Sequence, residues 1–280
     1  MGHERVGFLP RSRRWRDIVE AIGQSIPSGE PDNLPPLAAE TLECVRSRYL
    51  RIHNDRGVGA AFGFLVVLTG SEKDADRGKL TGVSIDLEGN PLPVRLAASL
   101  NEWVRLNRDS AEYAEIARRA GADTITSWTY KQRRQPSLFG AADNALEIWK
   151  NGRSAGGFCE ISRIFFASFT ERYLRYFLER EASSRFDNID AREQFSELLR
   201  KHLDKVSQHA FETAKITQSF AAGWYNNHVR GRCPSDSEIR DFLRLCFQKI
   251  REELLRKGLG SGLRMDLFSL FLIERRGEPS

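Results

Sequence analysis

The chain has 280 residues, of which 40% are hydrophobic and 29% are charged. This composition excludes a disordered chain, because disorder combines low hydrophobicity with high net charge, and the formal net charge here is only +5. Arginine carries most of the positive charge, with 34 Arg against 9 Lys, and the sequence pI is about 9.1. A polyanionic partner is therefore permitted but not required, and the arginine bias is also typical of a GC-rich bacterial genome.

No segment of the sequence predicts export or a membrane span. Met1–Arg16 is charged and lacks the apolar region of a signal peptide. The longest apolar run, Gly57–Thr69, is shorter than the roughly 20 residues that a bilayer requires. We therefore expect a cytoplasmic protein without membrane contact. The cysteines lack C-x-x-C spacing and are expected to be reduced thiols packed in cores: Cys44, Cys159, Cys233 and Cys246.

The N-terminal region, residues 1–150, is predicted to be mostly helical. It begins with the basic segment RSRRWRDIVEAIGQSI, in which Trp15, Ile18, Val19 and Ile22 have the three- and four-residue spacing of a short amphipathic helix. A proline-rich connector follows, and a second helix is expected over Pro36–Asn54.

The glycine-rich run Gly57–Leu68 allows two interpretations. It has the apolar character of a buried helix or of a buried strand. Val83, Ile85 and Leu87 alternate with polar residues as in a half-buried strand. A small β-hairpin over 62–87 and a buried helix therefore remain equal alternatives.

Two further helices are predicted before residue 135. Asn90 and Pro91 are suited to the N-cap and first turn of a helix that continues to Leu106. Asp109 and Glu112 have the spacing of a capping box at the start of the next helix.

The C-terminal half has the periodicity of three long amphipathic helices, which predicts an antiparallel bundle over residues 151–258. Ser235-x-x-Glu238 is a capping box at the start of the third helix. Residues 259–280 form an apolar tail. The three stripes are Phe158, Ile161, Phe165, Phe169, Tyr173 and Phe177; Phe195, Leu199, Leu203, Val206, Ala210, Ala214, Thr217, Phe220 and Trp224; and Ile239, Phe242, Cys246, Ile250 and Leu254. The predicted fold is thus mainly α.

The segment Glu112–Gln135 indicates a specific activity. Ala117 is small where a second helix would cross the first, Gly121 permits a left-handed turn, and Asp123 or Thr124 can cap a second helix. This pattern, IARRAGADTIT, resembles the helix-turn-helix of the lactose-repressor type of regulator. The resemblance is confined to this segment and implies a DNA-binding motif over residues 109–135.

The resemblance implies that the second helix reaches base edges while flanking cations hold phosphates. The implied base contacts are Thr124, Thr126 and Gln132. The implied phosphate contacts are Arg118, Arg119, Lys131, Arg133 and Arg134. An ordinary helical hairpin with a solvated charged face is the alternative. Aromatic rings among these cations are also typical of single-stranded nucleic-acid binding, although core packing accounts for them too: Trp128, Tyr130 and Phe139.

We predict neither a cofactor nor a metal site. The glycines at 57, 59 and 63 lack the preceding buried strand of a nucleotide-binding loop. His202 and His209 are seven residues apart, whereas a helical two-histidine metal site uses spacings of three or four. His53-Asn54-Asp55 is expected to cap a helix end rather than to form an acid–base cluster.

The leading hypothesis is a non-enzymatic DNA-associated subunit of a bacterial multi-protein assembly, and a role in defence against phage is compatible with it. The aromatic face Phe165–Phe177 is wider than one bundle is expected to bury, which predicts a protein partner or homo-oligomer there. The alternatives are a scaffold subunit that acts only through protein contacts and an enzyme whose site is assembled from distant segments.

Overall fold

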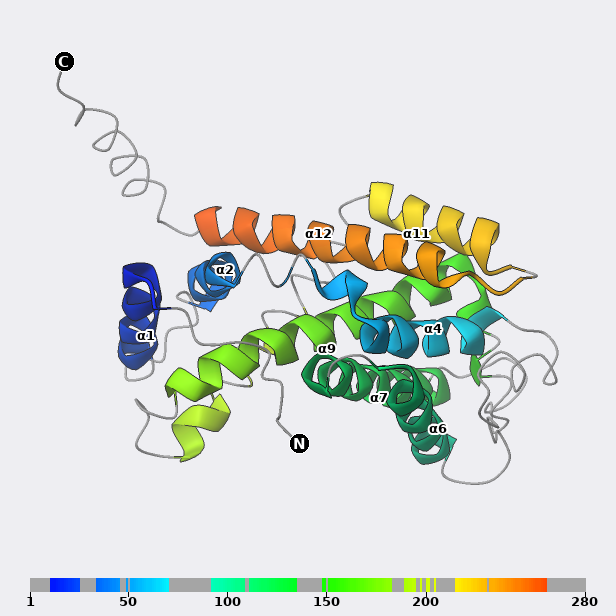
Figure 1. The fold of residues 1–280 in the computed structure, drawn as a ribbon, viewed down its shortest axis with the longest axis horizontal. Coiled ribbons are helices and arrows are strands. Elements are labelled where there is room, and N and C mark those ends of the chain that lie inside the picture. The colour runs from blue at the N-terminus through cyan, green and yellow to red at the C-terminus, as the bar shows by residue number, and fades with distance from the viewer. Residues whose placement is uncertain are drawn as a thin grey trace, which may run out of the picture.

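The computed structural model describes residues 11–25, 34–45, 49, 51–70, 92–108, 111–134, 148–149, 151–182, 189–194, 197, 200–201, 204, 215–230 and 232–260. Every regular element in these ranges is helical (Figure 1), which confirms the mainly α fold. The α-helices are α1 (Arg13–Ser25), α2 (Leu34–Cys44), α4 (Arg56–Gly70), α6 (Leu92–Asn107), α7 (Ala111–Arg134), α9 (Ala155–Ala182), α11 (Lys215–His228) and α12 (Asp236–Gly260). Short 3-10 turns are η2 (Ile52–Asn54) and η3 (Asn151–Arg153).

Helix α9 forms the centre of the molecule. It runs between α11 and α12 on one side and α6 and α7 on the other, with α4 alongside (Figure 1). Apolar side chains occur on several sides of α9, because neighbouring positions such as Phe165 and Phe166 are both fully buried. A helix that is apolar on most sides is expected inside a protein rather than on its surface.

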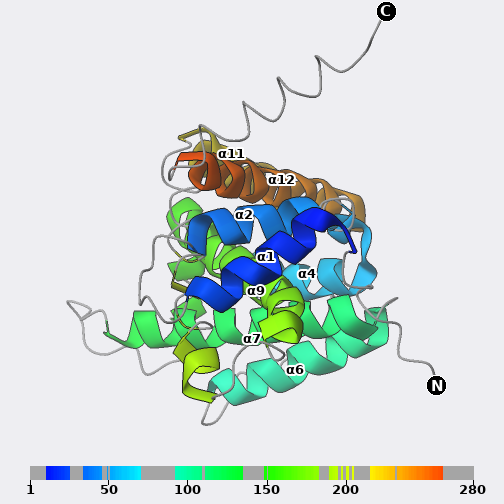
Figure 2. The same cartoon turned by 90° about the vertical axis from the view of Figure 1, so that its left-hand side faces the viewer.

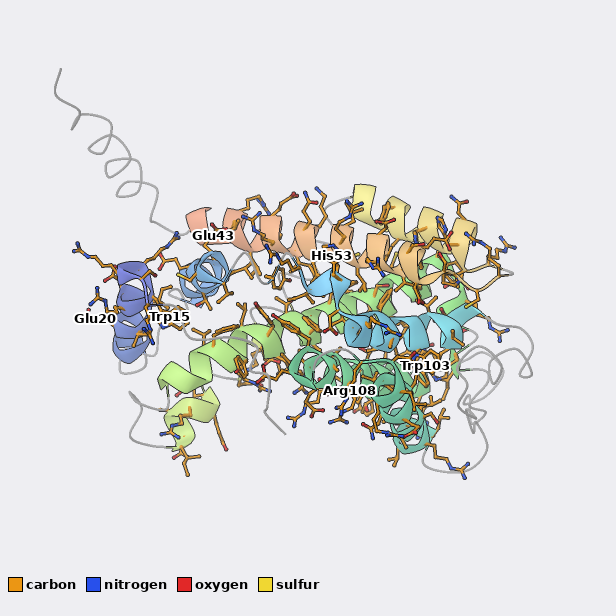
Figure 3. All side chains as sticks on the ribbon, in the orientation of Figure 1. Trp15, Glu20, Glu43, His53, Trp103 and Arg108 are labelled. Atoms are coloured by element: carbon orange, nitrogen blue, oxygen red, sulfur yellow. The ribbon has the colours of Figure 1, made fainter. Side chains whose placement is uncertain are left out.

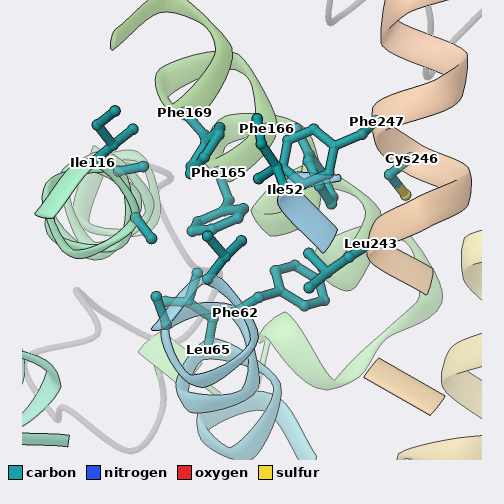
Figure 4. Close-up of a cluster of buried hydrophobic side chains, with 14 of the residues drawn as sticks. Ile52, Phe62, Leu65, Ile116, Phe165, Phe166, Phe169, Leu243, Cys246 and Phe247 are labelled. Atoms are coloured by element: carbon teal, nitrogen blue, oxygen red, sulfur yellow. The ribbon is translucent and has the colours of Figure 1, made fainter. Parts of the chain in front are cut away.

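The core is an aromatic cluster that joins both halves of the chain. Phe62 of α4 stacks on Phe242 of α12 with ring centroids 5.4 Å apart. Phe62 also packs against Phe165 and Phe166 of α9. Figure 4 shows the convergence of α4, α9 and α12 at this cluster. The predicted boundary at residue 150 therefore does not separate two cores in the described part of the chain.

Helix α1 lies at one end of the molecule, across α9 and beside α2 (Figure 2). The backbone NH of Trp15 donates to Ser12 Oγ at 3.2 Å, so Ser12 caps the helix. Trp15 points toward the rest of the protein whereas Glu20 points away from it (Figure 3). The predicted apolar spacing is confirmed for Trp15, Ile18 and Val19, which are buried.

Helix α4 decides between the two interpretations of the glycine-rich run. Residues Arg56–Gly70 form a buried α-helix, so the first arm of the β-hairpin alternative is wrong; residues 71–91 lie outside the described ranges. Asp55 caps this helix by accepting a hydrogen bond from the NH of Val58 at 3.0 Å. Gly57 lies against α7, since a Cβ at that position would be 2.6 Å from the Cβ of Ala114.

Helix α7 corrects the predicted turn at Gly121. The helix is unbroken from Ala111 to Arg134, so the segment does not fold as two helices joined by a turn. Gly121 instead allows α6 to approach α7 closely, because a Cβ there would be 2.6 Å from Cδ2 of the fully buried Leu100. Local residue types did not distinguish a turn glycine from a glycine at a close helix–helix contact.

Replacement of Gly121 by alanine is therefore expected to destabilise the protein by about 1–2 kcal/mol, because overpacking against Leu100 outweighs the better helix propensity of alanine. The control is Gly223→Ala in α11, where a Cβ has no neighbour within 4 Å. That variant is expected to gain about 0.5–1 kcal/mol. Urea unfolding followed by circular dichroism measures both, and effects of the same sign would contradict the packing role.

In the C-terminal half, the structure confirms one local prediction and corrects another. The capping box forms: Ser235 NH donates to Glu238 Oε2 at 2.8 Å, and Glu238 NH donates to Ser235 Oγ at 3.3 Å. The aromatic face Phe165–Phe177 is not a surface, because its rings lie in the core and only Tyr176 is partly exposed. Much of the predicted second stripe lies outside the described residues: Phe195, Leu199, Leu203, Val206, Ala210 and Ala214.

Candidate nucleic-acid interface

Two of the three predicted base contacts are buried. Thr124 has no exposed surface, and its hydroxyl donates to the carbonyl of Ala120 at 2.7 Å. Gln132 is buried, and its Oε1 accepts a hydrogen bond from Asn151 Nδ2 at 2.8 Å. Neither side chain can reach a base, because each lies between α7 and its neighbours. Thr126 is exposed.

The two arginines in the first half of α7 share one carboxylate of the same helix. Both Arg118 and Arg119 donate to Glu115, at distances between 2.6 and 2.8 Å. The hydrogen bond from Arg118, with help from Arg119, lowers the pKa of Glu115 to about 2. The carboxylate thus remains charged near neutral pH and offsets part of the positive charge assigned to phosphate binding.

Lys131 is held in a similar way by the neighbouring helix. Its Nζ donates to Glu160 Oε1 of α9 at 2.8 Å, and Arg163 donates to the same carboxylate. Burial alone would raise the pKa of Glu160, but these two cations lower it to about 2. Lys131 is exposed, but its hydrogen bond to Glu160 also links α7 to α9.

The outer face of the C-terminal half of α7 remains accessible. Thr126, Tyr130 and Arg133 are exposed on it, and the Tyr130 side chain is the most exposed ring in the described part of the chain, at 59%. The side chain of Arg134 lies outside the described part. On the inner side, Asp123 does not cap a second helix; it accepts hydrogen bonds from Arg172 Nη2 and Ser168 of α9, both at 2.6 Å.

A stronger cationic surface lies on α1. Four arginines within six residues are exposed around its first turn, and we name them the arginine cluster: Arg11, Arg13, Arg14 and Arg16. Among the described residues, no carboxylate lies within ion-pair distance of any of them. The first turn of α1 also lacks an acidic residue, although the positive end of the helix dipole favours one.

One member of the cluster faces α2. The charge of Arg14 lowers the pKa of Glu40 and of Cys44, but burial has the larger effect and raises both pKa values overall. Asp17 and Glu20 follow the arginines along α1, and they are exposed. In this order the acid is C-terminal to the base, which is the weaker arrangement for an intrahelical pair.

Elsewhere the exposed arginines commonly have an acid three or four residues before them. Such pairs close at 2.6–2.7 Å between Arg105 and Glu102, Arg200 and Glu197, and Arg256 and Glu253. The sequence already shows this difference, since the acids Asp17 and Glu20 follow the arginines of the basic segment. What distinguishes the arginine cluster is that four exposed arginines without an ion pair lie within six residues, whereas other such arginines, for example Arg51, Arg108 and Arg240, lie far apart in the sequence.

The described residues contain no group of three or more histidine, cysteine or acidic side chains placed to hold a metal ion. None of the helices in the described ranges is both long and apolar enough to cross a membrane.

None of the four cysteines forms a disulfide bond; Cys159 and Cys246 are buried as predicted, whereas Cys233 is exposed, which corrects its assignment to a core. Burial raises the pKa of Cys159 to about 11.

Comparison of the chain with known protein families, with curated protein sequences and with solved structures finds no match.

Proposed function

We propose that this protein is a non-enzymatic, nucleic-acid-associated protein that binds the phosphate backbone through the arginine cluster of α1. The observation that carries the proposal is the exposed positive charge around the first turn of α1, where no arginine forms an ion pair with a described residue. Guanidinium groups bind phosphate oxygens in a planar, forked geometry. A surface made of such groups recognises the backbone rather than the base sequence.

The position of α1 favours a rigid phosphate-binding surface. Trp15, Ile18 and Val19 fix one side of the helix in the core. The arginines occupy positions around the remaining surface, so their backbone is already ordered before a ligand arrives. Pre-ordering reduces the conformational entropy that binding would otherwise cost.

The same packing argues for nucleic acid over a membrane surface. A basic amphipathic helix binds a bilayer by inserting its apolar face among the lipids. In α1 that face is unavailable, because Trp15 is only 2% exposed and Ile18 is fully buried. Only the charged side can contact a partner, which suits the dense and regular phosphates of a nucleic acid.

The outer face of α7 supports a secondary contact in the same proposal. Arg133 and Thr126 are exposed there, and both were predicted as contacts. Arg118, Arg119 and Lys131 contribute less net charge, because Glu115 and Glu160 hold them. We therefore assign the main electrostatic contribution to α1.

The salt dependence of duplex binding tests the proposal. Each phosphate contact to duplex DNA changes the slope of log Kobs against log salt by about −0.9, so four arginines predict a slope of about −3 to −4. Fluorescence anisotropy with duplexes of unrelated sequence should give equal affinities. A lack of binding at about 20 mM salt would overturn the proposal, as would tighter binding to anionic lipid vesicles than to duplex.

A further inference from the structure

A compact ionic cluster joins the end of α11 to the start of α12, and it is independent of the arginine cluster. His228 is the last residue of α11, and its ring stacks on Trp224 with centroids 5.5 Å apart. Its Nδ1 lies 2.7 Å from Glu238 Oε1 and 2.7 Å from Arg232 Nη2. Arg232 Nη2 also donates to the same Oε1 at 2.6 Å.

These three atoms form a triangle in which only two sides can be hydrogen bonds at once. The guanidinium of Arg232 can only donate, and the carboxylate of Glu238 can only accept. A neutral imidazole carries a hydrogen on one nitrogen, so Nδ1 either accepts from Arg232 or donates to Glu238. In any one protonation and tautomeric state, Nδ1 of His228 therefore forms a hydrogen bond with either Arg232 or Glu238, but not with both.

Protonation removes this choice. Both ring nitrogens of a charged histidine are donors, so Nδ1 can only donate, and Glu238 is the acceptor that faces it. Arg232 then faces a like charge at the distance of a former hydrogen bond. A charged His228 also suits the C-terminal end of α11, just as Glu238 suits the first turn of α12.

We propose that His228 is a proton-sensitive switch in the α11–α12 connection: when the ring is protonated, its contact with Arg232 Nη2 is lost and His228 donates to Glu238. In the neutral state Arg232 binds both His228 and Glu238. In the charged state Arg232 Nη2 moves away from the ring, while Nη1 keeps its contact with Glu238 Oε2 at 3.3 Å and Nε keeps its hydrogen bond to the carbonyl of Asn227 at 3.1 Å.

The charged groups around His228 are few in the described part of the chain. Arg232 and Glu238 are in direct contact, and Asp236 lies near enough to raise the pKa of Cys233, although burial of that thiol has the larger effect. Glu238 is itself held in its charged form by Arg232 first, then by the Ser235 NH and His228, which lower its pKa. Glu238 therefore remains a charged acceptor in both states of the switch.

Nuclear magnetic resonance of the full chain tests the switch without any substitution. The ring signals of His228 and the rotation rate about the Nε–Cζ bond of Arg232 are followed as the pH is lowered from about 8 to about 5. Arg232 is expected to rotate several-fold faster in the protonated state, with the same midpoint as the His228 titration. Rotation that does not change through that titration would overturn the proposal.

Two matched variants separate this switch from a general effect of pH. His228→Asn keeps a polar group near Nδ1 but cannot become charged, so the pH response of Arg232 should disappear. His53→Asn removes a histidine from η2 and should leave that response intact. A response that persists in His228→Asn would assign the motion of Arg232 to another group and contradict the proposal.

Discussion

The Phe62→Ala variant is expected to lose about 3–5 kcal/mol of unfolding free energy, the range measured when large aromatic side chains are removed from cores. Phe62 is fully buried at the meeting point of α4, α9 and α12 (Figure 4). Its ring centroid lies 5.3–6.3 Å from those of four others: Phe158, Phe165, Phe166 and Phe242. Truncation leaves a cavity that three helices cannot close together, so the lost contacts add to the lost burial.

Urea unfolding followed by circular dichroism measures this loss. The control is Phe220→Ala in α11, because Phe220 is only partly buried and its one ring neighbour among the described residues is Phe242, at 5.7 Å. Its cost is expected to be about 1–2 kcal/mol. A loss below about 1 kcal/mol for Phe62→Ala would show that this cluster does not organise the fold.

Elements with strong terminal signals were predictable from the sequence. Asn90–Leu106 was predicted and α6 spans Leu92–Asn107. Ser235 and Glu238 marked the start of α12, where the reciprocal hydrogen bonds form. Such local features depend on side chains three or four residues apart, which the sequence fixes whatever the tertiary fold.

The prediction of a turn at Gly121 was wrong because a local sequence pattern does not show which residues pack against the glycine. A glycine between an alanine and a potential cap is compatible with a turn and also with a close crossing of two helices. The deciding atom belongs to Leu100, which is 21 positions earlier in the chain. The local pattern therefore could not identify which requirement the glycine meets.

The prediction that the aromatic face Phe165–Phe177 would be a surface was wrong for a similar reason. The stripe from Phe165 to Phe177 was judged against a three-helix bundle, and it appeared too wide to be covered. In the structure α4 and η2 from the N-terminal half complete the cover, with Phe62 and Ile52 against the rings of α9 and α12. Which distant segment covers a helix is a property of topology, and periodicity does not specify it.

Ion pairs between arginines and nearby acids on one helix are easier to predict from the sequence than these packing contacts. Glu115 precedes Arg118 and Arg119 by three and four residues, the order that favours an ion pair. The acids of α1 come after the arginines instead. Arginines that a local acid pairs with could thus have been separated from those that remain available, which are Arg133 on α7 and the arginine cluster, and most of the candidate interface would have moved from α7 to α1.

The largest expected effect on duplex binding comes from reversing the charge of the arginine cluster. The triple variant Arg11→Glu, Arg13→Glu and Arg16→Glu is expected to reduce duplex affinity by at least about 100-fold at about 20 mM salt, because three phosphate contacts become repulsive. The slope of log Kobs against log salt should fall in magnitude by about 3. Arg14 is retained because it lies near Glu40 and Cys44 of α2.

Two controls separate the loss of the binding site from effects on folding and on net charge. Glutamate in the first turn of α1 suits the helix dipole, so circular dichroism should show an unchanged helix content. The matched control is Arg51→Glu, Arg108→Glu and Arg240→Glu, which changes net charge equally at exposed positions on η2's flank, the end of α6 and α12. At about 0.1 M salt its affinity should fall less than about tenfold, since long-range charge is then screened over about 10 Å. Equal losses in the two triple variants would show that affinity follows total charge, and the arginine cluster would then have no special part in binding.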